Sequence, residues 1–288
     1  MFKFGFSGTE SNQDNDDNGD KNSELNWFPA VEINVTEEQI ARDYDHEDED
    51  DFMMNKICGM NIKLFRLENI VLKLKDNEHE NIIKAESQHS DLLPAVYEGG
   101  LKVWECSYDL GEYILSQDIP LKNLRVLDLG CGAGILGIIA LLRGAVVHFQ
   151  DYNQEVIEMF TIPNVLLNST DRKLIKQKAE FYAGDWAEFI QLSANKYPNE
   201  DEKYDIIFTC ETIYNSDNQK KLYQVFKERL KNNGVGYVAG KTYYFGVGGG
   251  MRQFESLIKD DNTFNVENVW TSDQGLQREI MKLTRQPN

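Results

Sequence analysis

Cysteine, histidine and proline are scarce in this chain of 288 residues, which contains four, four and six of them respectively. No two of the cysteines (Cys58, Cys106, Cys131 and Cys210) are close in sequence, and the histidines do not cluster with them. The spacing of a zinc site is therefore absent, and we expect no metal. Scattered single cysteines are typical of a reducing compartment, which predicts a protein of the cytoplasm and nucleus.

Long apolar runs are also lacking. The first six residues, Met1–Phe6, contain no apolar signal core. No stretch approaches the roughly 20 apolar residues that a membrane-spanning helix needs. We therefore expect no membrane partner, in agreement with the location inferred from the cysteines.

Positive charge is in the minority, with 30 Lys and Arg against 48 Asp and Glu and a net charge of −18. The excess is concentrated in residues 1–54, which contain 16 acidic and 3 basic residues. Nucleic-acid phosphates would be repelled, so we expect no direct nucleic-acid partner, whereas a basic protein is suitable. The low-complexity composition of residues 7–26 cannot bury enough apolar surface to fold, which predicts an acidic, largely disordered tail over residues 1–55. The acidic run 43–51 is interpreted as a solvated linker or, alternatively, as a segment that attracts a basic substrate electrostatically.

Apolar patterns define the rest of the chain. We interpret residues 56–95 as an N-terminal extension that packs on the domain, and residues 96–288 as the domain itself. Strands are predicted at 125–129, 146–150, 180–183, 204–209, 235–240, 264–270 and 278–284. Helices are predicted at 111–117, 154–169 (interrupted by Pro163), 217–231 and 253–259. This alternation predicts an α/β fold with a doubly wound, mostly parallel seven-stranded sheet. The segment 241–251, rich in aromatics and glycine, is interpreted as a mobile flap or substrate loop.

The stretch 125–137 is an apolar run that ends in an acid and glycines and continues into an apolar helical pattern. Strand, tight turn and helix in this order are typical of an α/β nucleotide-binding unit. Residues 132–137 match the dinucleotide pattern G-x-G-x-x-G by letter, but that pattern starts where the strand ends. Here the strand ends at Leu129, so Gly130 is the first glycine of the turn and Ile135 stands in place of the third. The register argues against a nicotinamide dinucleotide; the other alternative is an ordinary turn.

Counted from Gly130, the pattern Asp128-x-Gly130-x-Gly132-x-Gly134 resembles motif I of the class I S-adenosylmethionine-dependent methyltransferases. In that family the acid at the Asp128 position acts near the methionine end of the cofactor, and the glycines make room for it. A second acid, Asp151, ends the next predicted strand 19 positions after Gly132. Such an acid can accept hydrogen bonds from both ribose hydroxyls of an adenosine ligand; alternatively it caps the following helix.

Two further acids follow predicted strands. Asp185 stands beside Trp186 after the third strand, where an acid and an aromatic can bind an adenine amino group and cover the ring. Glu211 and Tyr214 follow the fourth strand at its carboxyl end, where open α/β sheets place their ligands. The loop around Trp104 is dense in glycines, aromatics and acids and is interpreted as a ligand-contacting loop, although Trp104 alone would suit a core position.

Four longer strings carry a closer resemblance. They are Val96-Tyr97-Glu98-Gly99-Gly100-Leu101-Lys102-Val103-Trp104-Glu105-Cys106, Phe149-Gln150-Asp151-Tyr152-Asn153, Ile162-Pro163-Asn164-Val165 and Cys210-Glu211-Thr212-Ile213-Tyr214-Asn215. Together they resemble the histidine protein methyltransferase 1 homolog family, over about residues 91–288. The resemblance implies a Rossmann-like class I methyltransferase fold, with S-adenosylmethionine as the cofactor and S-adenosylhomocysteine as the product.

The resemblance also implies roles for individual residues. The cofactor-binding residues that it implies are Trp104, Glu105, Cys106, Ser107, Asp128, Gly130, Gly132, Gly134, Asp151, Tyr152, Asn153, Gly184, Asp185, Trp186 and Cys210. Glu211 and Tyr214 are implied to face the acceptor. An acid such as Glu211 or Asp109 can accept the second ring N–H of an acceptor imidazole and stabilise the imidazolium that forms.

The implied reaction transfers one methyl group to the tele nitrogen of a histidine in a basic protein, the third large-subunit ribosomal protein, and the enzyme is expected to be a monomer. Neutral imidazole carries a free lone pair at physiological pH because its pKa is near ~6.5, whereas a lysine must first lose a proton from a pKa near ~10.4. A lysine methyltransferase of the same fold remains open as the alternative. A binding protein without catalysis and a nicotinamide oxidoreductase are the other two classes considered.

Overall fold

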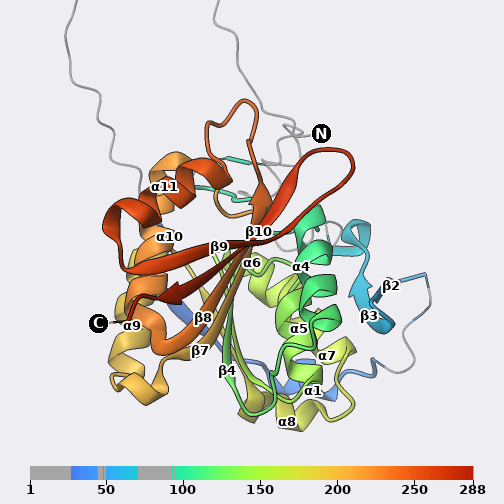
Figure 1. The fold of residues 1–288 in the computed structure, drawn as a ribbon. Coiled ribbons are helices and arrows are strands. Elements are labelled where there is room, and N and C mark those ends of the chain that lie inside the picture. The colour runs from blue at the N-terminus through green and yellow to red at the C-terminus, as the bar shows by residue number, and fades with distance from the viewer. Residues whose placement is uncertain (1–26, 45–47, 49, 71–91, 94, 288) are drawn as a thin grey trace, which may run out of the picture.

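The computed structural model describes residues 27–44, 48, 50–70, 92–93 and 95–287, and these form an α/β structure around one large sheet (Figure 1). Eight strands pair in the order β1-β6-β5-β4-β7-β8-β10-β9. Their bounds are β1 (Val31–Ile33), β4 (Arg125–Leu129), β5 (Val146–Asp151), β6 (Ala179–Ala183), β7 (Tyr204–Cys210), β8 (Leu230–Lys241), β9 (Phe264–Thr271) and β10 (Arg278–Arg285). The predicted seven-stranded, mostly parallel sheet is confirmed, and β1 adds an eighth strand at its edge.

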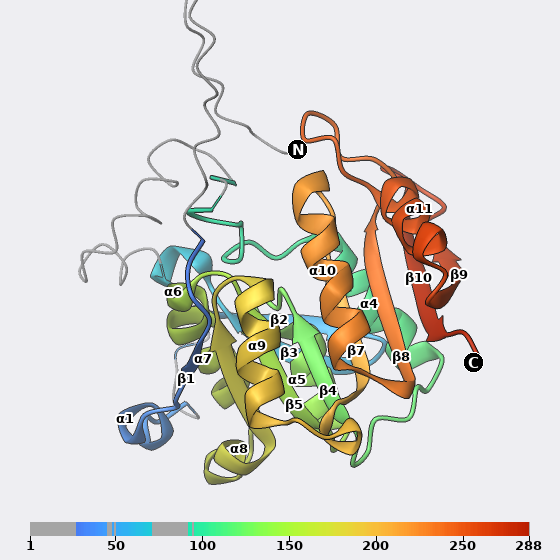
Figure 2. The same cartoon turned by 90° about the vertical axis from the view of Figure 1, so that its left-hand side faces the viewer.

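The five central strands are parallel, and β10 enters antiparallel between β8 and β9. The chain moves outward from β4 through β5 to β6, then returns to the other side of β4 with β7 and β8. The strand order therefore reverses between β4 and β7, and the carboxyl ends of strands at such a point leave a crevice for a ligand. Figure 2 shows these strands packed between the helices.

Helices cover both faces of the sheet. Those on one face are α4 (Glu105–Ser116), α5 (Ile135–Leu142), α6 (Gln154–Val156), α7 (Ile162–Leu167) and α8 (Arg172–Lys178). Those on the other face are α9 (Trp186–Lys196), α10 (Ser216–Arg229) and α11 (Met251–Asp261). Each layer encloses its own core, with Phe149 and Ile139 in the first and Phe226 and Phe254 in the second. Among the described residues, no helix is long and apolar enough to cross a membrane.

Two helices differ from the prediction. The ligand-contacting loop ends at Trp104, the N-cap residue of α4, so residues 105–110 are helical rather than part of that loop. Glu105 in the first turn of α4 interacts favourably with the helix dipole. Pro163 does not interrupt the helical path, because a π turn, η1 (Ile157–Thr161), leads directly into α7 and Pro163 occupies the first turn, where no N–H is required.

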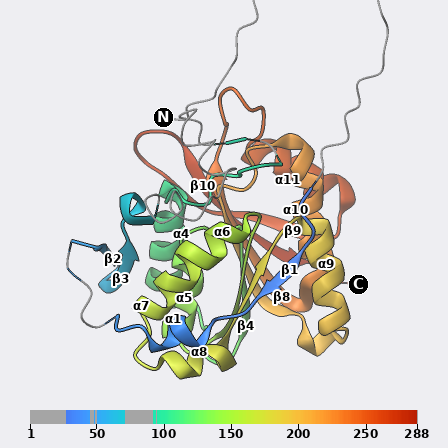
Figure 3. The same cartoon turned by 180° about the vertical axis from the view of Figure 1, so that it is seen from behind.

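Part of the predicted tail is ordered. β1 pairs antiparallel with β6, and the short helix α1 (Glu37–Ala41) begins with a capping box between Thr36 and Gln39. The prediction considered composition alone, whereas an available edge on β6 orders a segment that could not fold by itself. Residues before 27 lie outside the described part of the chain. Figure 3 shows β1 at the sheet edge beside α9.

A hairpin precedes the main domain. β2 (Phe52–Ile57) and β3 (Met60–Phe65) pair antiparallel, and β3 packs against α5 and α7. The Asn164 side chain of α7 accepts a hydrogen bond from the Phe65 N–H at 2.9 Å. The hairpin overlaps the predicted extension 56–95 only from residue 56 onward, and residues 71–91 and 94 of that extension lie outside the described residues.

His148 on β5 is fully buried. Its Nδ1 lies 2.9 Å from the Tyr204 hydroxyl, and its Nε2 lies 3.4 Å from Glu180 Oε2. Burial disfavours the charged ring and lowers the pKa of His148 to about 3. His148 is therefore a neutral core residue with a polar partner, and it takes no part in the crevice.

We expect a His148→Asn variant to gain stability relative to the wild type as the pH falls. Asparagine keeps a polar atom near the position of Nδ1 but does not titrate. The pKa of His148 is about 3 in the folded chain and near ~6.5 in the unfolded chain. Between these values only the unfolded wild type binds the proton, so its free energy of unfolding falls by up to about 1.4 kcal/mol per pH unit relative to the variant. Urea unfolding of both proteins over a pH series measures this difference, and a difference that does not change with pH would contradict it.

Candidate active site

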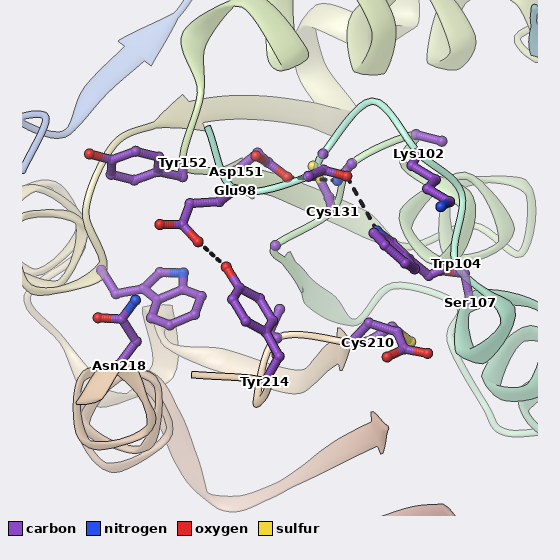
Figure 4. A pocket seen from close by; sticks show the side chains of 18 of the residues that line it. Glu98, Lys102, Trp104, Ser107, Cys131, Asp151, Tyr152, Cys210, Tyr214 and Asn218 are labelled. Atoms are coloured by element: carbon purple, nitrogen blue, oxygen red, sulfur yellow. Dashed lines mark hydrogen bonds between the residues drawn. The ribbon is translucent and has the colours of Figure 1, made fainter. Parts of the chain in front are cut away.

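A pocket opens at the carboxyl ends of β4, β5, β6 and β7 (Figure 4). Its open space is about 800 Å³, including the mouth. Five segments supply most of its wall, namely 98–104, 130–135, 151–152, 184–186 and 210–218. Two of these segments directly follow β4 and β6, and two begin with the last residues of β5 and β7, so the sheet itself fixes the wall.

The glycine turn forms the floor of the pocket. Gly130 and Gly132 line it, with φ angles of 67° and 49°. A Cβ on Gly132 would lie 2.9 Å from the Gly100 carbonyl oxygen, so the loop carrying Gly100 rests directly on the turn. Gly134 is the N-cap residue of α5 and does not line the pocket. The predicted strand, turn and helix are confirmed, and of the three glycines two contribute to the wall.

Asp128 lies below the turn and not on the pocket wall. It is buried, and its Oδ2 accepts a hydrogen bond from the Gly137 N–H at 2.8 Å. Burial raises the pKa of Asp128 to about 7. The carboxyl group connects the first turn of α5 to β4 and so shapes the glycine turn. The resemblance implied a position near the cofactor, but Asp128 does not line the pocket.

Asp151 lines the pocket at the end of β5, as predicted. Its Oδ2 accepts a hydrogen bond from the Gly132 N–H at 2.8 Å, which links β5 to the glycine turn. Burial raises the pKa of Asp151 to about 6. The N-cap residue of α6 is Asn153, not Asp151, so the alternative assignment of Asp151 as a helix cap is not observed.

Asn153 is buried and does not line the pocket. Its side-chain nitrogen donates to the Val96 carbonyl at 2.8 Å, and its side-chain oxygen accepts from the Glu98 N–H at 3.2 Å. The implied contact of Asn153 with a ligand is therefore replaced by a contact with the loop that covers the pocket. No local pattern indicates this contact, because Asn153 is 57 residues from Val96 and 55 residues from Glu98 in the chain.

One end of the pocket is formed by Tyr152, Gly184, Asp185 and Trp186. Asp185 caps α9 by accepting the Ala187 N–H at 2.9 Å, and its other carboxylate oxygen lies 2.6 Å from Lys221 Nζ. The predicted acid and aromatic thus occupy one wall, with the acid paired to a cation.

Trp104, Ser107 and Cys210 line the opposite end. The Trp104 indole N–H donates to the Gly99 carbonyl at 3.2 Å, which fixes the ring against the covering loop. Burial raises the pKa of the Cys210 thiol well above its ordinary value, so it is a neutral wall and not a nucleophile.

Two residues with an implied cofactor contact do not reach this wall. Cys106 is fully buried behind it, and its carbonyl oxygen accepts the Cys210 S–H at 3.4 Å. The side chain of Glu105 is 60% exposed and lies 3.4 Å from Lys241 Nζ. Both residues follow Trp104 in the first turn of α4, and of these neighbours only Trp104 and Ser107 line the pocket. The helix was predicted to begin at residue 111, so the turning of these side chains away from the pocket was not expected.

Glu211 lines the pocket directly after β7. Its φ of 56° is in the left-handed region, which is uncommon for a residue other than glycine. Oε2 accepts a hydrogen bond from the Tyr244 hydroxyl at 2.5 Å, and Oε1 lies 3.6 Å from Lys241 Nζ. Oε1 is buried and receives no hydrogen bond from any described residue. Oε1 therefore lacks the donor that a buried carboxylate oxygen normally has.

Tyr244 corrects the expectation for the loop 241–251. It is buried, and the Gly249 N–H donates to the Tyr214 carbonyl at 3.0 Å, so this part of the loop is anchored to the site. Its neighbours Tyr243 and Phe245 are 63% and 78% exposed, as a substrate-facing loop would have them. The sequence pattern could not separate the one aromatic that points inward from the two that do not.

Tyr214 and Glu98 meet across the pocket, where the phenol donates a hydrogen bond to the carboxylate (Figure 4). Glu98 Oε1 also accepts the Ala95 N–H at 3.0 Å. Burial raises the pKa of both side chains. Sequence reasoning assigned no role to Glu98, although it lies within the string that carries the resemblance.

Asp109 does not line this pocket. It lies on α4 and pairs with Arg278, with 2.5 Å between the Asp109 Oδ2 and the Arg278 Nε. It borders a separate groove with Tyr113 and Trp270. The proposed acceptor role of Asp109 is therefore corrected, because the helix turns this side chain away from the pocket. Within the described ranges, no three or more His, Cys, Asp or Glu side chains are grouped so that they could hold a metal.

Known proteins are similar to this chain in sequence. A family model described as lysine methyltransferase matches residues 95–245. The Histidine protein methyltransferase 1 homolog of Dictyostelium discoideum is 46% identical over 201 residues, which are 69% of this chain and 62% of that protein. The homolog of Rattus norvegicus is 37% identical over 263 residues, which are 83% of this chain and 72% of that protein. The chain belongs to the histidine protein methyltransferase 1 homolog family. It spans only about three fifths of the length of the Dictyostelium homolog, with 62% of that protein matched.

The fold has counterparts outside this family. A solved structure titled as a putative S-adenosylmethionine-dependent methyltransferase from Streptococcus mutans matches with a TM-score of 0.52 and 11% identity, over 83% of this chain and 57% of that chain. At this identity the likeness shows the fold alone. The family and the sheet order are those of class I methyltransferases, as the glycine register predicted.

Proposed function

We propose that this chain is a protein-histidine methyltransferase that uses S-adenosylmethionine and releases S-adenosylhomocysteine. Membership of the histidine protein methyltransferase 1 homolog family supports the reaction class. The observation that carries the proposal within the site is Glu211 Oε1, a buried oxygen on the pocket wall that receives no hydrogen bond from a described residue.

The pocket residues fit this cofactor. Gly132 lets the loop that carries Gly100 close over the glycine turn, because a Cβ on Gly132 would lie 2.9 Å from the Gly100 carbonyl oxygen. Asp151 would accept the ribose hydroxyls with its charged carboxylate, in addition to the Gly132 N–H that it already holds. Tyr152, Gly184, Asp185 and Trp186 would surround the adenine, and Trp104, Ser107 and Cys210 would lie along the methionine half.

S-adenosylmethionine would supply a methyl group bound to a positively charged sulfur. Glu211 Oε1 would accept the N–H of the imidazole, which leaves the lone pair on the other ring nitrogen free and selects one tautomer. The same carboxylate would stabilise the positive charge that develops on the ring. Tyr244 and Lys241 hold Glu211 in place, so little reorganisation is required. Tyr214, fixed by Glu98, would limit the position of the acceptor ring.

We further propose the tele nitrogen as the site of methylation and the third large-subunit ribosomal protein as the substrate, as the family resemblance implies. The net charge of −18 supports a basic protein partner and disfavours direct binding of nucleic acid. We propose that the enzyme acts as a monomer in the cytoplasm and nucleus.

A lysine methyltransferase is the second candidate, because the matching family model carries that description. A lysine acceptor would have to lose a proton before transfer, from a pKa near ~10.4 in water. Lys241 Nζ lies 3.6 Å from Glu211 Oε1 and would oppose the binding of an acceptor that is already charged more than the binding of a neutral ring. This arrangement favours neutral imidazole over an ammonium group.

We expect labelled methyl groups to appear on a histidine ring. The purified chain is incubated with labelled S-adenosylmethionine and a lysate of cells that lack their own copy of this enzyme, and the labelled peptides are located by mass spectrometry. The modified protein is then made with its acceptor histidine replaced by alanine. Label on lysine, or label that persists on the histidine-free substrate, would overturn the histidine assignment in favour of the second candidate.

A further inference from the structure

The apolar segment 27–33 precedes the part of the chain that the family model matches, and the proposed reaction does not use it. The segment runs along the edge of the sheet and ends in β1, which pairs with β6 from Val31↔Ala183 to Ile33↔Phe181 (Figure 3). Its first described residue, Trp27, lines the pocket. We propose that Trp27 is a cofactor-binding residue and that the segment 27–33, named the N-terminal strap, completes the adenine end of the pocket.

Backbone contacts place the strap directly against the pocket wall. The Asp185 N–H donates to the Phe28 carbonyl at 3.0 Å. A Cβ on Gly184 would lie 2.4 Å from the Pro29 carbonyl oxygen, so only glycine permits this approach. Both Gly184 and Asp185 belong to the wall assigned to adenine, so the strap is fixed to that wall by the main chain of both segments.

Aromatic contacts tie the strap to Tyr152. The rings of Phe28 and Tyr152 stack with centroids 5.2 Å apart, and Trp27 meets Tyr152 edge-on at 5.8 Å. The Tyr152 hydroxyl accepts the Phe28 N–H at 3.2 Å and donates to the Ala95 carbonyl at 2.9 Å. Tyr152 therefore connects the strap with the loop that covers the pocket from the other side.

Lys221 of α10 holds the indole of Trp27 in position. Its Nζ lies 3.7 Å from the centroid of the Trp27 ring and 2.6 Å from Asp185 Oδ2. A cation between an indole face and a carboxylate is attracted by both. Trp27, Lys221 and Asp185 thus form one connected group at this end of the pocket, and Trp27 keeps part of its surface toward the open space rather than packing in the core.

An aromatic ring at this place suits a purine base. Tyr152 and Trp186 already line the same end, and a third ring would bury a flat, uncharged base from a further side. Stacking between a base and an aromatic side chain does not depend on hydrogen bonds, so it adds affinity without competing with Asp151 or Asp185. The inference rests on the orientation of the cofactor in the proposed function, with the adenine at the end where β5 and β6 terminate.

The test is the affinity for S-adenosylhomocysteine, measured by calorimetry on the full chain. Trp27→Ala is expected to weaken binding roughly ten-fold, within the range for loss of one aromatic ring stacked on a base. Trp27→Phe, which keeps an aromatic ring, is expected to bind within about three-fold of the wild type. Trp270→Ala is the matched control, because Trp270 lies on β9 and does not line the pocket.

Adenosine separates a contact with the base from a general effect on the fold. Trp27→Ala is expected to weaken adenosine, measured by competition, by the same factor as S-adenosylhomocysteine. Unchanged affinity for S-adenosylhomocysteine in Trp27→Ala, or a loss that adenosine does not share, would overturn the role of Trp27. A wild-type chain that binds neither compound would instead overturn the proposed function on which the inference rests.

Discussion

Replacement of Glu211 by glutamine is expected to reduce methyl transfer by roughly a hundred-fold or more, within the range for loss of a positioned acid or base. Glutamine keeps the size of the side chain but lacks the charge that would stabilise the imidazolium. The affinity for S-adenosylhomocysteine is expected to change little, because Glu211 acts on the acceptor. Steady-state rates with the protein substrate and calorimetry with S-adenosylhomocysteine measure the two effects separately.

The matched control for Glu211→Gln is Glu279→Gln. Glu279 on β10 is also a buried carboxylate with a cationic partner, Arg252, but it does not line the pocket. Its replacement is expected to lower stability while the rate with folded protein stays near that of the wild type. Equal losses of rate in the two variants would show that any disturbed buried ion pair has this effect, and Glu211 would lose its assigned role.

Replacement of Asp151 by alanine is expected to weaken the binding of S-adenosylhomocysteine by roughly ten- to a hundred-fold, the equivalent of losing hydrogen bonds to a charged acceptor. The alanine variant also releases the Gly132 N–H from its partner, so part of the loss comes from the glycine turn. Asp151→Asn separates the two contributions, because the amide keeps an oxygen for that N–H and replaces the other carboxylate oxygen by an NH2 group without charge. Calorimetry measures the affinity of both variants for S-adenosylhomocysteine. An unchanged affinity in the alanine variant would contradict the assignment of Asp151 to the ribose.

The charge of Asp151 also predicts a dependence of affinity on pH. Its pKa is raised to about 6 by burial, and the ionised form is the better acceptor for the ribose hydroxyls. Binding by the wild type is therefore expected to be constant well above pH 6 and to weaken as the pH falls through that value. In Asp151→Asn this component is expected to disappear. A dependence that remains in Asp151→Asn would belong to another group, and Glu98 also lines the pocket and has a pKa raised by burial.

Local patterns were sufficient for the glycine turn and for most strands. The register of Gly130 relative to the end of β4 depends only on residues that are neighbours in sequence, so it could be predicted and was confirmed. The same holds for the closing pair β9 and β10, whose alternating apolar residues are contiguous. Asp151 and Glu211 each sit at the end of a strand, and the geometry of a parallel sheet brings such ends together.

Side-chain directions could not be predicted in the same way. Asp109 and Ser107 are two residues apart, yet the helix turns Ser107 to the pocket and Asp109 to Arg278. Tyr244 is buried against Glu211 between two exposed aromatics, a distinction that depends on the path of the whole loop. In each case the outcome was decided by a partner far away in sequence.

The class of fold, the family and the acids that end the strands follow from periodicity, glycine register and motif strings, which are local properties of the chain. Which of these groups reach the pocket depends on the packing of the whole chain. Asp128 and Asn153 instead make contacts that shape loops, whereas Glu98 and Trp27, to which the sequence pattern assigned no role, lie on the wall. Buried polar groups and open sheet edges form hydrogen bonds with the segment that the fold brings close to them. That segment can lie anywhere in the sequence, so local patterns do not reveal it.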